Sequence, residues 1–340
     1  VGMVTELSGT NAVNGEMCRK GFEVGIATSI QDGKLGDRPV RFFLGDHRGE
    51  AKTGVSEFKR IVELEGAHVF ITSRSQVAMA VNPLAKAAGI AIPGTVGQKD
   101  FTKENPAAMR FFPSTAAEGP LLASTAYKQG MRRMATITLE DEWTLSLADE
   151  FQTAFKKEGG SIIITERIHP DDPDLISLIS RVRSAAPDGV LINVNVALSG
   201  VLIRRLREQG VSSALFGNFW SSYPEVIKSA GIENIEGMIF VTINMEKPIY
   251  QKRFQELFPG VEGGSLSYCC YSAMRAALQG AEQIIGEMSR GALLESMLAQ
   301  KEIKLLDENL AMRNREAQFD LVPRIVKNGI VANFNSGLRR

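Results

Sequence analysis

The chain has 340 residues, of which 44% are apolar, and its 39 basic side chains are balanced by 39 acidic ones. This composition is typical of a globular protein with a sizeable core. A protein with a formal net charge of zero lacks the attraction that nucleic-acid-binding and membrane-surface proteins have for their partners, so neither class is expected. The length corresponds to about two domains, which leaves room for a cleft between two lobes.

Strands and helices alternate over the first third of the chain. Residues 1–7 form a largely apolar stretch that predicts a strand, and residues 14–30 follow with Met17, Gly21 and Val24 at helical spacing. The same pattern recurs before Pro113. The further strands expected there lie at residues 40–44, 68–71 and 90–92.

A second series of the same kind begins after Pro113. The strands expected in it lie at residues 134–138, 161–165, 190–192, 214–216 and 238–241. Beyond residue 243 the pattern predicts mainly helix, over 249–258 and 266–288, until strand-like character resumes at 319–322.

This alternation predicts the fold class. Wholly apolar strands that alternate with helices favour parallel sheets with helices on both faces. About five strands on each side of Pro113 favour two doubly wound lobes over one very wide sheet. The late helices have no sheet of their own, so we expect them to return to the first lobe. The predicted fold is α/β, with a first lobe of residues 1–113 and 244–322, a second of 114–243 and 323–340, and a ligand cleft between them.

Residues for metal, cofactor or catalytic chemistry are missing at the required spacings. The three histidines, His47, His68 and His169, are far apart and belong to no zinc-binding pattern. No glycine-rich phosphate loop or nucleophile elbow follows a predicted strand. We therefore expect no metal, no cofactor and no enzymatic activity.

Three other motifs can each be interpreted as functional or as a coincidental or structural feature. Ser56 and Lys59 match the Ser-x-x-Lys of penicillin-recognising enzymes, but the Lys-Thr-Gly motif lies just before them instead of far downstream, which favours coincidence. The acidic run 140–142 could hold a cation or face solvent. Cys269 and Cys270 are adjacent, so a bond between them is disfavoured, and we expect them to pack in the core.

The sequence leaves the compartment open. No apolar run approaches the ~20 residues of a membrane-spanning helix. The protein is then either cytosolic or exported with its signal removed, and its three cysteines do not decide between the two.

Loops rich in hydroxyls, glycine and amides follow the predicted strands. In open α/β sheets, ligands bind beyond the carboxyl ends of the strands, where helix N-termini offer unpaired N–H groups to an anion. Because these loops hold no nucleophile, base or metal set, the sequence favours binding over catalysis. They lie at residues 8–10, 72–75, 93–97, 193–195 and 217–220.

An ordered series of short motifs carries a family likeness. It comprises ELSG at 6–9, SQVAMA at 75–80, GIAIP at 89–93, RFFPS at 110–114, EDEW at 140–143, APDGV at 186–190 and IEGM at 235–238. This series resembles the type 1 periplasmic binding proteins of ABC importers, and more specifically the Leu/Ile/Val-binding group. The likeness covers roughly residues 1–290.

The resemblance implies a fold, a partner and a compartment. Two α/β lobes joined by three crossover strands close on a small ligand like a hinge and deliver it to an ABC permease in the inner membrane. The protein is then an exported monomer, either periplasmic with its signal removed or lipid-anchored outside the membrane.

The resemblance also nominates binding residues in the first lobe. In amino-acid-binding relatives, a serine hydroxyl and backbone N–H groups hold the ligand carboxylate, and Ser75 matches that serine. Ser75 could also cap its helix. Arg74 could add a charge-assisted bond to a carboxylate or stay solvated. The next loop of the family supplies a carbonyl and a threonine hydroxyl, which Val96 and Gly97 match here, with Thr95 nearby.

The second lobe departs further from the family pattern. Trp143 matches an aromatic residue of the family, whereas Asn195 stands where the family has a tyrosine. Phe219 stands where the family has the glutamate that neutralises the ligand ammonium. A buried, unpaired ammonium beside Phe219 would lose several kcal/mol relative to water. Trp143, Phe219 and Trp220 are therefore expected to form an aromatic wall, with polar contacts from Asn14 and Asn195.

The leading hypothesis is an extracytoplasmic solute-binding component of an ABC importer for a small carboxylate without a required amine. An aromatic or branched aliphatic acid fits that description. One alternative is a branched-chain or other neutral amino-acid-binding protein, with Phe219 or Trp220 packed in the core. Another is a ligand-sensing receptor or regulator domain of the same fold.

Overall fold

The computed structural model describes residues 1–9, 11–169 and 174–334, and the chain forms two compact units. The first unit comprises Val1–Ser114 and Asn244–Asp320, and the second comprises Thr115–Ile243 and Leu321–Arg340. The chain therefore passes between the units three times, at 114/115, 243/244 and 320/321. The expected lobe bounds differ from these by one residue at the first crossover and by two at the third.

The sheet of the first unit has a parallel centre and an antiparallel edge. Its strands run in the order β13-β14-β15-β7-β6-β5-β1-β4. The strands from β15 to β4 pair in parallel, whereas β13, β14 and β15 pair antiparallel with one another. Their bounds are Gly2–Thr5 (β1), Phe43–Asp46 (β4), Phe70–Ser73 (β5), Ile92–Thr95 (β6), Ala108–Arg110 (β7), Glu302–Lys304 (β13), Asn309–Arg313 (β14) and Glu316–Ala317 (β15).

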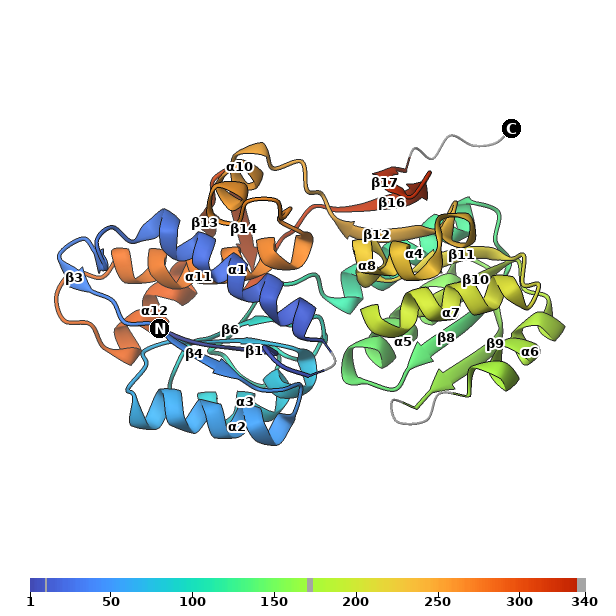
Figure 1. Ribbon diagram of the computed structural model, residues 1–340. Helices are drawn as coiled ribbons and strands as arrows, with labels where there is room; N and C mark the ends of the chain where they lie inside the picture. The colour runs from blue at the N-terminus through green and yellow to red at the C-terminus, as the bar shows by residue number, and fades with distance from the viewer. Residues whose placement is uncertain (10, 170–173, 335–340) are drawn as a thin grey trace. The chain divides into compact units, whose positions relative to one another are not determined.

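Helices cover both faces of this sheet (Figure 1). The helices are α1 (Ala12–Ser29), α2 (Ala51–Phe58, continued by a π-helical turn at Lys59–Leu64), α3 (Ser75–Ala87), α10 (Pro248–Leu257), α11 (Ser265–Glu282) and α12 (Arg290–Ala299). Helices α2 and α3 lie on the face where Val4, Phe70 and Ile92 form an apolar core with them. A small hairpin of β2 (Lys34–Leu35) and β3 (Arg38–Pro39) stands apart from the sheet.

Helices α1 and α11 pack side by side, although more than 200 residues separate them in sequence (Figure 1). Gly21 permits the close approach, since a Cβ atom there would lie 2.1 Å from the carbonyl oxygen of Ser267. A disulfide between Cys18 and Cys270 joins the two helices, while Cys269 is a buried free thiol. Both adjacent cysteines are buried in the core, as expected, and Cys270 in addition forms a disulfide with a distant helix, which the sequence pattern did not predict.

The sheet of the second unit has the order β17-β16-β12-β11-β10-β8-β9. The strands from β12 to β9 pair in parallel, and β12, β16 and β17 pair antiparallel. Their bounds are Arg133–Leu139 (β8), Ser161–Ile168 (β9), Gly189–Asn193 (β10), Ala214–Gly217 (β11), Ile239–Ile243 (β12), Leu321–Lys327 (β16) and Ile330–Asn333 (β17).

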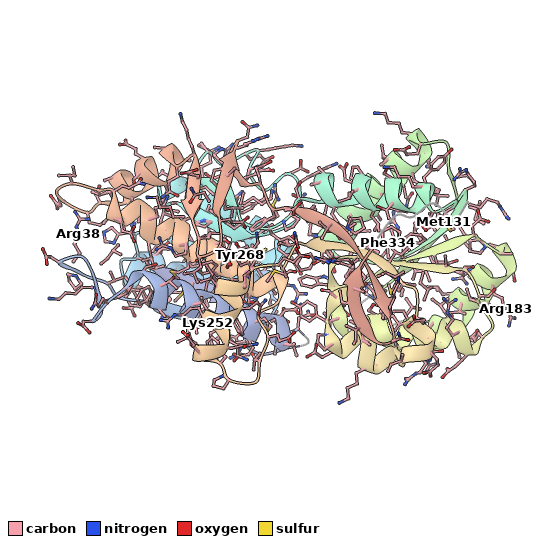
Figure 2. All side chains as sticks on the ribbon, turned by 90° about the horizontal axis from the view of Figure 1, so that it is seen from above. Arg38, Met131, Arg183, Lys252, Tyr268 and Phe334 are labelled. Carbon is pink, nitrogen blue, oxygen red and sulfur yellow. A yellow bond between two sulfur atoms is a disulfide. The ribbon has the colours of Figure 1, made fainter. Side chains whose placement is uncertain are left out.

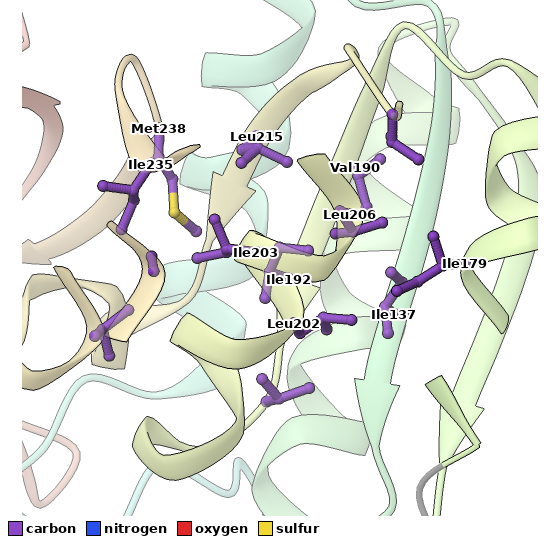
Figure 3. Packing of buried hydrophobic residues seen from close by; sticks show 14 of the residues in the cluster. Ile137, Ile179, Val190, Ile192, Leu202, Ile203, Leu206, Leu215, Ile235 and Met238 are labelled. Atoms are coloured by element: carbon purple, nitrogen blue, oxygen red, sulfur yellow. The ribbon is translucent and has the colours of Figure 1, made fainter. Parts of the chain in front are cut away.

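Helices also cover both faces of the second sheet. They are α4 (Thr115–Lys128), α5 (Glu142–Lys157), α6 (Leu175–Ala185), α7 (Val196–Glu208), α8 (Pro224–Ala230) and α9 (Ile232–Ile235), with a 3₁₀ turn at Phe219–Ser222. On one face Ile179, Leu202 and Leu206 pack against the strand residues Ile137 and Ile192 (Figure 3). On the other, α4 and α5 form a second apolar cluster with the sheet. These two layers confirm the predicted doubly wound α/β architecture.

The region between residues 288 and 319 differs from the expectation. The sequence pattern predicts no strand there, whereas the structure has β13, β14 and β15. These strands have five residues or fewer, and Glu302 and Lys304 flank a single apolar residue in β13. Short, polar strands at a sheet edge lack the apolar run that marks a central strand.

Surface and interior side chains separate as expected for a folded domain. Arg183 and Lys252 are exposed, whereas Tyr268 is fully buried between helices (Figure 2). Among the described residues, no helix combines the length and apolar character needed to cross a bilayer.

Candidate functional site

The first unit gathers polar residues at the carboxyl edge of its sheet. Strands β1, β4, β5 and β6 are parallel, so their carboxyl ends meet at one edge. They end at Thr5, Asp46, Ser73 and Thr95. Parallel α/β sheets bind ligands at this edge. Thr10, part of the first predicted loop, lies outside the described residues.

A buried hydrogen-bond chain underlies this edge. The Nε2 atom of His47 lies 3.3 Å from the Ser73 hydroxyl, which donates to the Thr5 hydroxyl at 2.9 Å. Burial, reinforced by the positive charge of Arg74, lowers the pKa of His47 to about 4. His47 is therefore neutral at neutral pH and adds no positive charge to the edge.

Arg74 and Ser75 lie where β5 turns into α3. Arg74 has φ 66° and ψ 121°, a conformation that side-chain-bearing residues rarely adopt and that is found mainly at functional sites. Its guanidinium forms an ion pair with the buried carboxylate of Glu6. The charge that Arg74 could present to a ligand is thus partly satisfied already, and its role as a carboxylate ligand remains a prediction.

Ser75 is the first residue of α3 rather than its cap. The cap position is Arg74, and no side chain caps this helix. The hydroxyl of Ser75 instead accepts a hydrogen bond from the backbone N–H of Gln98 at 3.4 Å. The alternative of a plain helix N-cap for Ser75 is therefore wrong, and the side chain links the loop after β5 to the loop after β6.

The last residue of β6, Thr95, and the first two residues of the loop after it, Val96 and Gly97, are the three other candidates of this edge. The Thr95 hydroxyl lies 3.8 Å from each sulfur of the Cys18–Cys270 disulfide. Val96 is buried in the apolar core, so only its backbone could contact a ligand, and Gly97 is also buried. On α1, the Oδ1 atom of Asn14 is buried and has no hydrogen-bond partner within the described residues, which leaves it available to a ligand or water.

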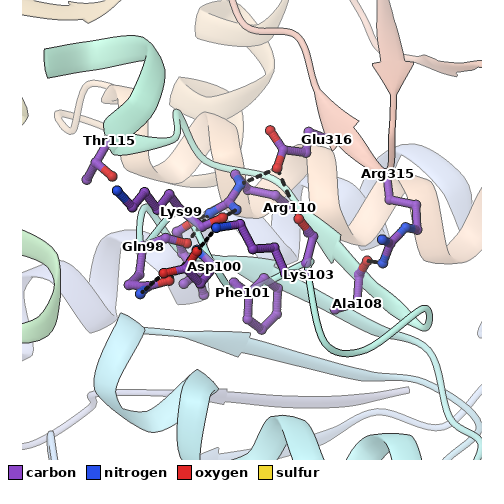
Figure 4. A network of polar contacts seen from close by, with 12 residues as sticks. Gln98, Lys99, Asp100, Phe101, Lys103, Ala108, Arg110, Thr115, Arg315 and Glu316 are labelled. Atoms are coloured by element: carbon purple, nitrogen blue, oxygen red, sulfur yellow. Dashed lines mark hydrogen bonds and ion pairs between the residues drawn. The ribbon is translucent and has the colours of Figure 1, made fainter. Parts of the chain in front are cut away.

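Arg110 organises this loop, and the sequence reasoning missed it (Figure 4). Its guanidinium donates to the carbonyl oxygens of Val96 (2.9 Å), Gln98 (2.6 Å) and Lys99 (3.0 Å). The side chain is 1% exposed, and its Nε lies 3.2 Å from the Glu316 carboxylate. The signal that could have revealed it is a single charge inside the apolar run 107–112.

In the second unit, the carboxyl edge gathers aromatic residues. Asp141 caps α5 by accepting hydrogen bonds from the N–H groups of Trp143 and Thr144, which sets the start of the helix after β8. The rings of Trp143 and Trp220 meet edge to face with centroids 5.5 Å apart. Trp220 also contacts Phe219 at 5.2 Å and Tyr223 at 5.7 Å. The structure thus brings the three predicted aromatic residues together, although Phe219 is fully buried.

Asparagine side chains tie the strand ends of this unit together. Asn195 caps α7, with its Oδ1 accepting from the N–H of Leu198 at 3.0 Å, so the amide nitrogen is the donor that Asn195 can offer a ligand. Asn218 donates to the Asn193 side chain at 3.2 Å and to the Val194 carbonyl at 2.9 Å. Asn195 therefore lies at the carboxyl edge of the second sheet and fixes the start of α7 there.

A buried carboxyl group lies behind Phe219. Glu118 of α4 is 1% exposed, and its Oε1 accepts a hydrogen bond from the backbone N–H of Phe219 at 2.9 Å. Its Oε2 is buried without a hydrogen-bond partner within the described residues. Burial raises the pKa of Glu118 to about 8, so the group is mostly protonated at neutral pH. The sequence held a signal that Glu118 is buried. Glu118 precedes Leu122 by four residues and Ala126 by eight, so all three lie on one face of the helix, and the other two are apolar and buried.

Metal binding has no support in the described segments, which hold no cluster of three histidine, cysteine, aspartate or glutamate side chains suited to an ion. Glu140, in the acidic run, is paired with Arg167 at 3.9 Å instead. The two edges therefore offer hydroxyls, amides, backbone groups and aromatic rings, which are groups for binding a small organic molecule.

Two doubly wound units connected by three crossovers define the type 1 periplasmic binding protein fold. The leucine binding protein LivK of Thermotoga maritima has this fold, with a TM-score of 0.88, 21% identity, and coverage of 98% of this chain and 97% of that one. A solute binding protein of R. palustris in complex with benzoate has a TM-score of 0.86 at 20% identity, with coverage of 98% and 94%.

Sequence comparison leads to the same family. The Leu/Ile/Val-binding protein homolog 3 of Brucella melitensis is 24% identical over 243 residues, which is 71% of this chain. The chain spans 66% of the length of that curated relative. A family model for periplasmic binding proteins matches residues 1–322, so the chain belongs to the periplasmic binding protein family. This confirms the resemblance seen in the ordered motifs.

Proposed function

We propose that the protein is the extracytoplasmic solute-binding component of an ABC importer and that it binds a small carboxylate, an aromatic or branched aliphatic acid, without requiring an amine. The candidate ligand groups lie at the carboxyl edge of the sheet within each unit, and the bound ligand is then delivered to a membrane permease. Family membership supports the class of function, and the site residues support the ligand class.

The observation that carries the ligand class is the environment of Phe219. This residue stands where the family likeness expects an ammonium-neutralising glutamate. The carboxyl group next to its backbone, Glu118, is mostly protonated at neutral pH because it is buried. A neutral acid and a phenyl ring do not compensate an ammonium, whereas Trp143 and Trp220 provide apolar area for an aryl or alkyl group.

The first unit supplies groups for the carboxylate. The Ser75 hydroxyl and the N–H groups at the start of α3 can donate to an anion, because the first N–H groups of a helix lack partners inside the helix. Arg74 is close by in sequence, and its pairing with Glu6 reduces the excess charge it adds. A carboxylate is therefore the ligand group that this edge fits best.

A branched-chain or other neutral amino acid is the second candidate. Curated relatives have Leu/Ile/Val-binding names, and the Oε2 atom of Glu118 is free of hydrogen bonds within the described residues. An ammonium ion near this atom would favour the ionised carboxylate. In that case the affinity for leucine should fall sharply in Glu118→Gln, whereas the affinity for a carboxylate without an amine should not.

The Cys18–Cys270 disulfide supports an extracytoplasmic location, either periplasmic or lipid-anchored outside the membrane. Disulfides persist in oxidising compartments and are rare in the cytosol. This support does not depend on the family likeness.

A ligand screen tests the proposal. Benzoate and 4-methyl-2-oxopentanoate are compared with leucine, isoleucine and valine by thermal shift and by tryptophan fluorescence. Both tryptophans of the chain, Trp143 and Trp220, belong to the second unit, so an emission change reports on that unit. We expect stabilisation and an emission change with the acids and a loss of both in Ser75→Ala. Stabilisation by the amino acids alone would refute the ligand class.

A further inference from the structure

Arg110 occupies a connecting position in the first unit. It is the last residue of β7 and precedes the first crossover, at 114/115, by only a few residues. Its β-bridge partner is Glu316 of β15, which precedes the third crossover, at 320/321. One fully buried side chain therefore lies next to the segments that enter two of the three crossovers.

The contacts of the guanidinium point in two directions (Figure 4). On one side its Nη atoms donate to the carbonyls of Val96, Gln98 and Lys99, which are consecutive or nearly consecutive residues of the loop after β6. On the other side its Nε pairs with the Glu316 carboxylate, which also accepts a hydrogen bond from Thr102 at 3.1 Å.

The burial of the Arg110–Glu316 pair constrains the positions of the groups around it. Burying a guanidinium that is 1% exposed is costly unless its charge is balanced and its donors have partners. Here the Nη atoms donate to three carbonyls, and the Glu316 carboxylate balances the charge at 3.2 Å from Nε, which makes an ion pair but no hydrogen bond. The planar group can meet three carbonyls and one carboxylate only in a narrow geometry. A displacement of the loop therefore changes the position of Arg110 relative to Glu316, and a displacement of Glu316 changes the loop.

We propose that Arg110 is a positioning residue that holds the 95–99 loop in its ligand-binding conformation and couples this loop, through Glu316, to the segment that enters the third crossover. The part that concerns affinity rests on the proposed function, whereas the coupling itself does not.

Hydrogen exchange of the ligand-free protein tests the coupling. The variants are Arg110→Met, which removes the donors, and Glu316→Gln, which keeps the shape of the side chain but removes its charge. We expect amides of residues 96–99 to exchange at least about tenfold faster in both variants, because the loop carbonyls lose a fixed partner. Glu316 lies in β15 and not in this loop. If the loop amides exchange at the wild-type rate in Glu316→Gln, the coupling is overturned.

A matched control comes from the same unit. Arg290 of α12 also donates to backbone carbonyls, those of Ala67 and Val62, but it lies away from the loop after β6. Arg290→Met removes the same kind of guanidinium-to-carbonyl hydrogen bonds, and the exchange of residues 96–99 in this variant should equal that in the wild type. An equal acceleration in this control would show a general loss of stability and would overturn the assignment to Arg110.

Calorimetric titration tests the effect on affinity, with benzoate and 4-methyl-2-oxopentanoate as probes. It is done at a temperature where each variant is fully folded. We expect at least about tenfold weaker binding in Arg110→Met, a smaller loss in Glu316→Gln, and wild-type affinity in Arg290→Met. Wild-type affinity in Arg110→Met would overturn the positioning role. If the wild type binds neither probe, the proposed ligand class fails, and the exchange experiment still decides the coupling.

Discussion

Replacing Glu118 by glutamine is expected to remove a large part of the pH dependence of the stability of the second unit. Burial raises the pKa of Glu118 from 4.5 to about 8 in the folded protein. Between these values the unfolded chain releases the proton while the folded protein keeps it. The free energy of unfolding therefore falls as the pH rises from about 4.5 to about 8, and this contribution is constant outside that window.

The size of the expected loss in unfolding free energy follows from the change in the pKa of Glu118. A pKa change of one unit is worth about 1.4 kcal/mol, so the rise from 4.5 to about 8 sets an upper limit of roughly 5 kcal/mol on the loss. Glutamine keeps an oxygen that can accept from the N–H of Phe219, but it adds an N–H group beside the unpartnered Oε2 position. That group costs about 1–3 kcal/mol at every pH.

Urea unfolding of the wild type and of Glu118→Gln at several pH values between 5 and 9 measures the effect. The two stability curves should converge as the pH rises, and the variant should become relatively more stable by a few kcal/mol. Glu158→Gln, which changes an exposed glutamate of the same unit, is the control and should leave the wild-type slope unchanged. A constant difference between the wild type and Glu118→Gln across this range would refute the account of a buried, protonated carboxyl group.

Three further changes test other parts of the structure. Burial, together with Arg74, lowers the pKa of His47 to about 4, so stability should fall as the pH drops from about 6.5 to 4, and His47→Gln should flatten this fall in acid unfolding. Removing the disulfide with Cys18→Ala and Cys270→Ala should lower the stability of the first unit by about 2–5 kcal/mol, seen as a lower calorimetric transition that reducing agent no longer shifts. Leu202→Ala in the core of the second unit should cost about 2–5 kcal/mol in urea unfolding, whereas Leu202→Met should cost less than about 1.5 kcal/mol.

The central strands of both sheets could be predicted because their sequence pattern is strong. Strands such as β8 and β10 are buried over nearly their whole length and rich in apolar residues, since helices cover both of their faces, and turns or helices bound them clearly. The edge strands β13 to β15 are short, and one face of such a strand can be polar, so they carry no comparable pattern.

The site could be predicted only in part. The loops after parallel strands are recognisable in sequence, and Ser75, Trp143 and Asn195 do lie at the predicted strand ends. Contacts between distant segments are not recognisable from one sequence. The pairing of Cys18 with Cys270 spans 252 residues, and no local pattern selects it over the neighbouring thiol.

Buried ionisable residues were the main ones missed. Arg110 and Glu118 lie within apolar runs, where an ionisable side chain has no local explanation, and their partners come from other loops. A charged residue at a position that the periodicity assigns to the core is therefore the signal to follow. In this protein Arg110 and Glu118 each bind the backbone of a predicted binding residue: Arg110 donates to the carbonyl of Val96, and Glu118 accepts from the N–H of Phe219.

The most direct test of the account compares two ligands that differ in one group. Leucine and 4-methyl-2-oxopentanoate share a carboxylate and a branched side chain, and the amine of the first is a keto group in the second. Calorimetric titration of the wild type at pH 7 should give an affinity for the keto acid at least about tenfold higher than for leucine, because Phe219 and protonated Glu118 do not compensate an ammonium. Tighter binding of leucine would contradict the claim that the site selects a carboxylate without an amine.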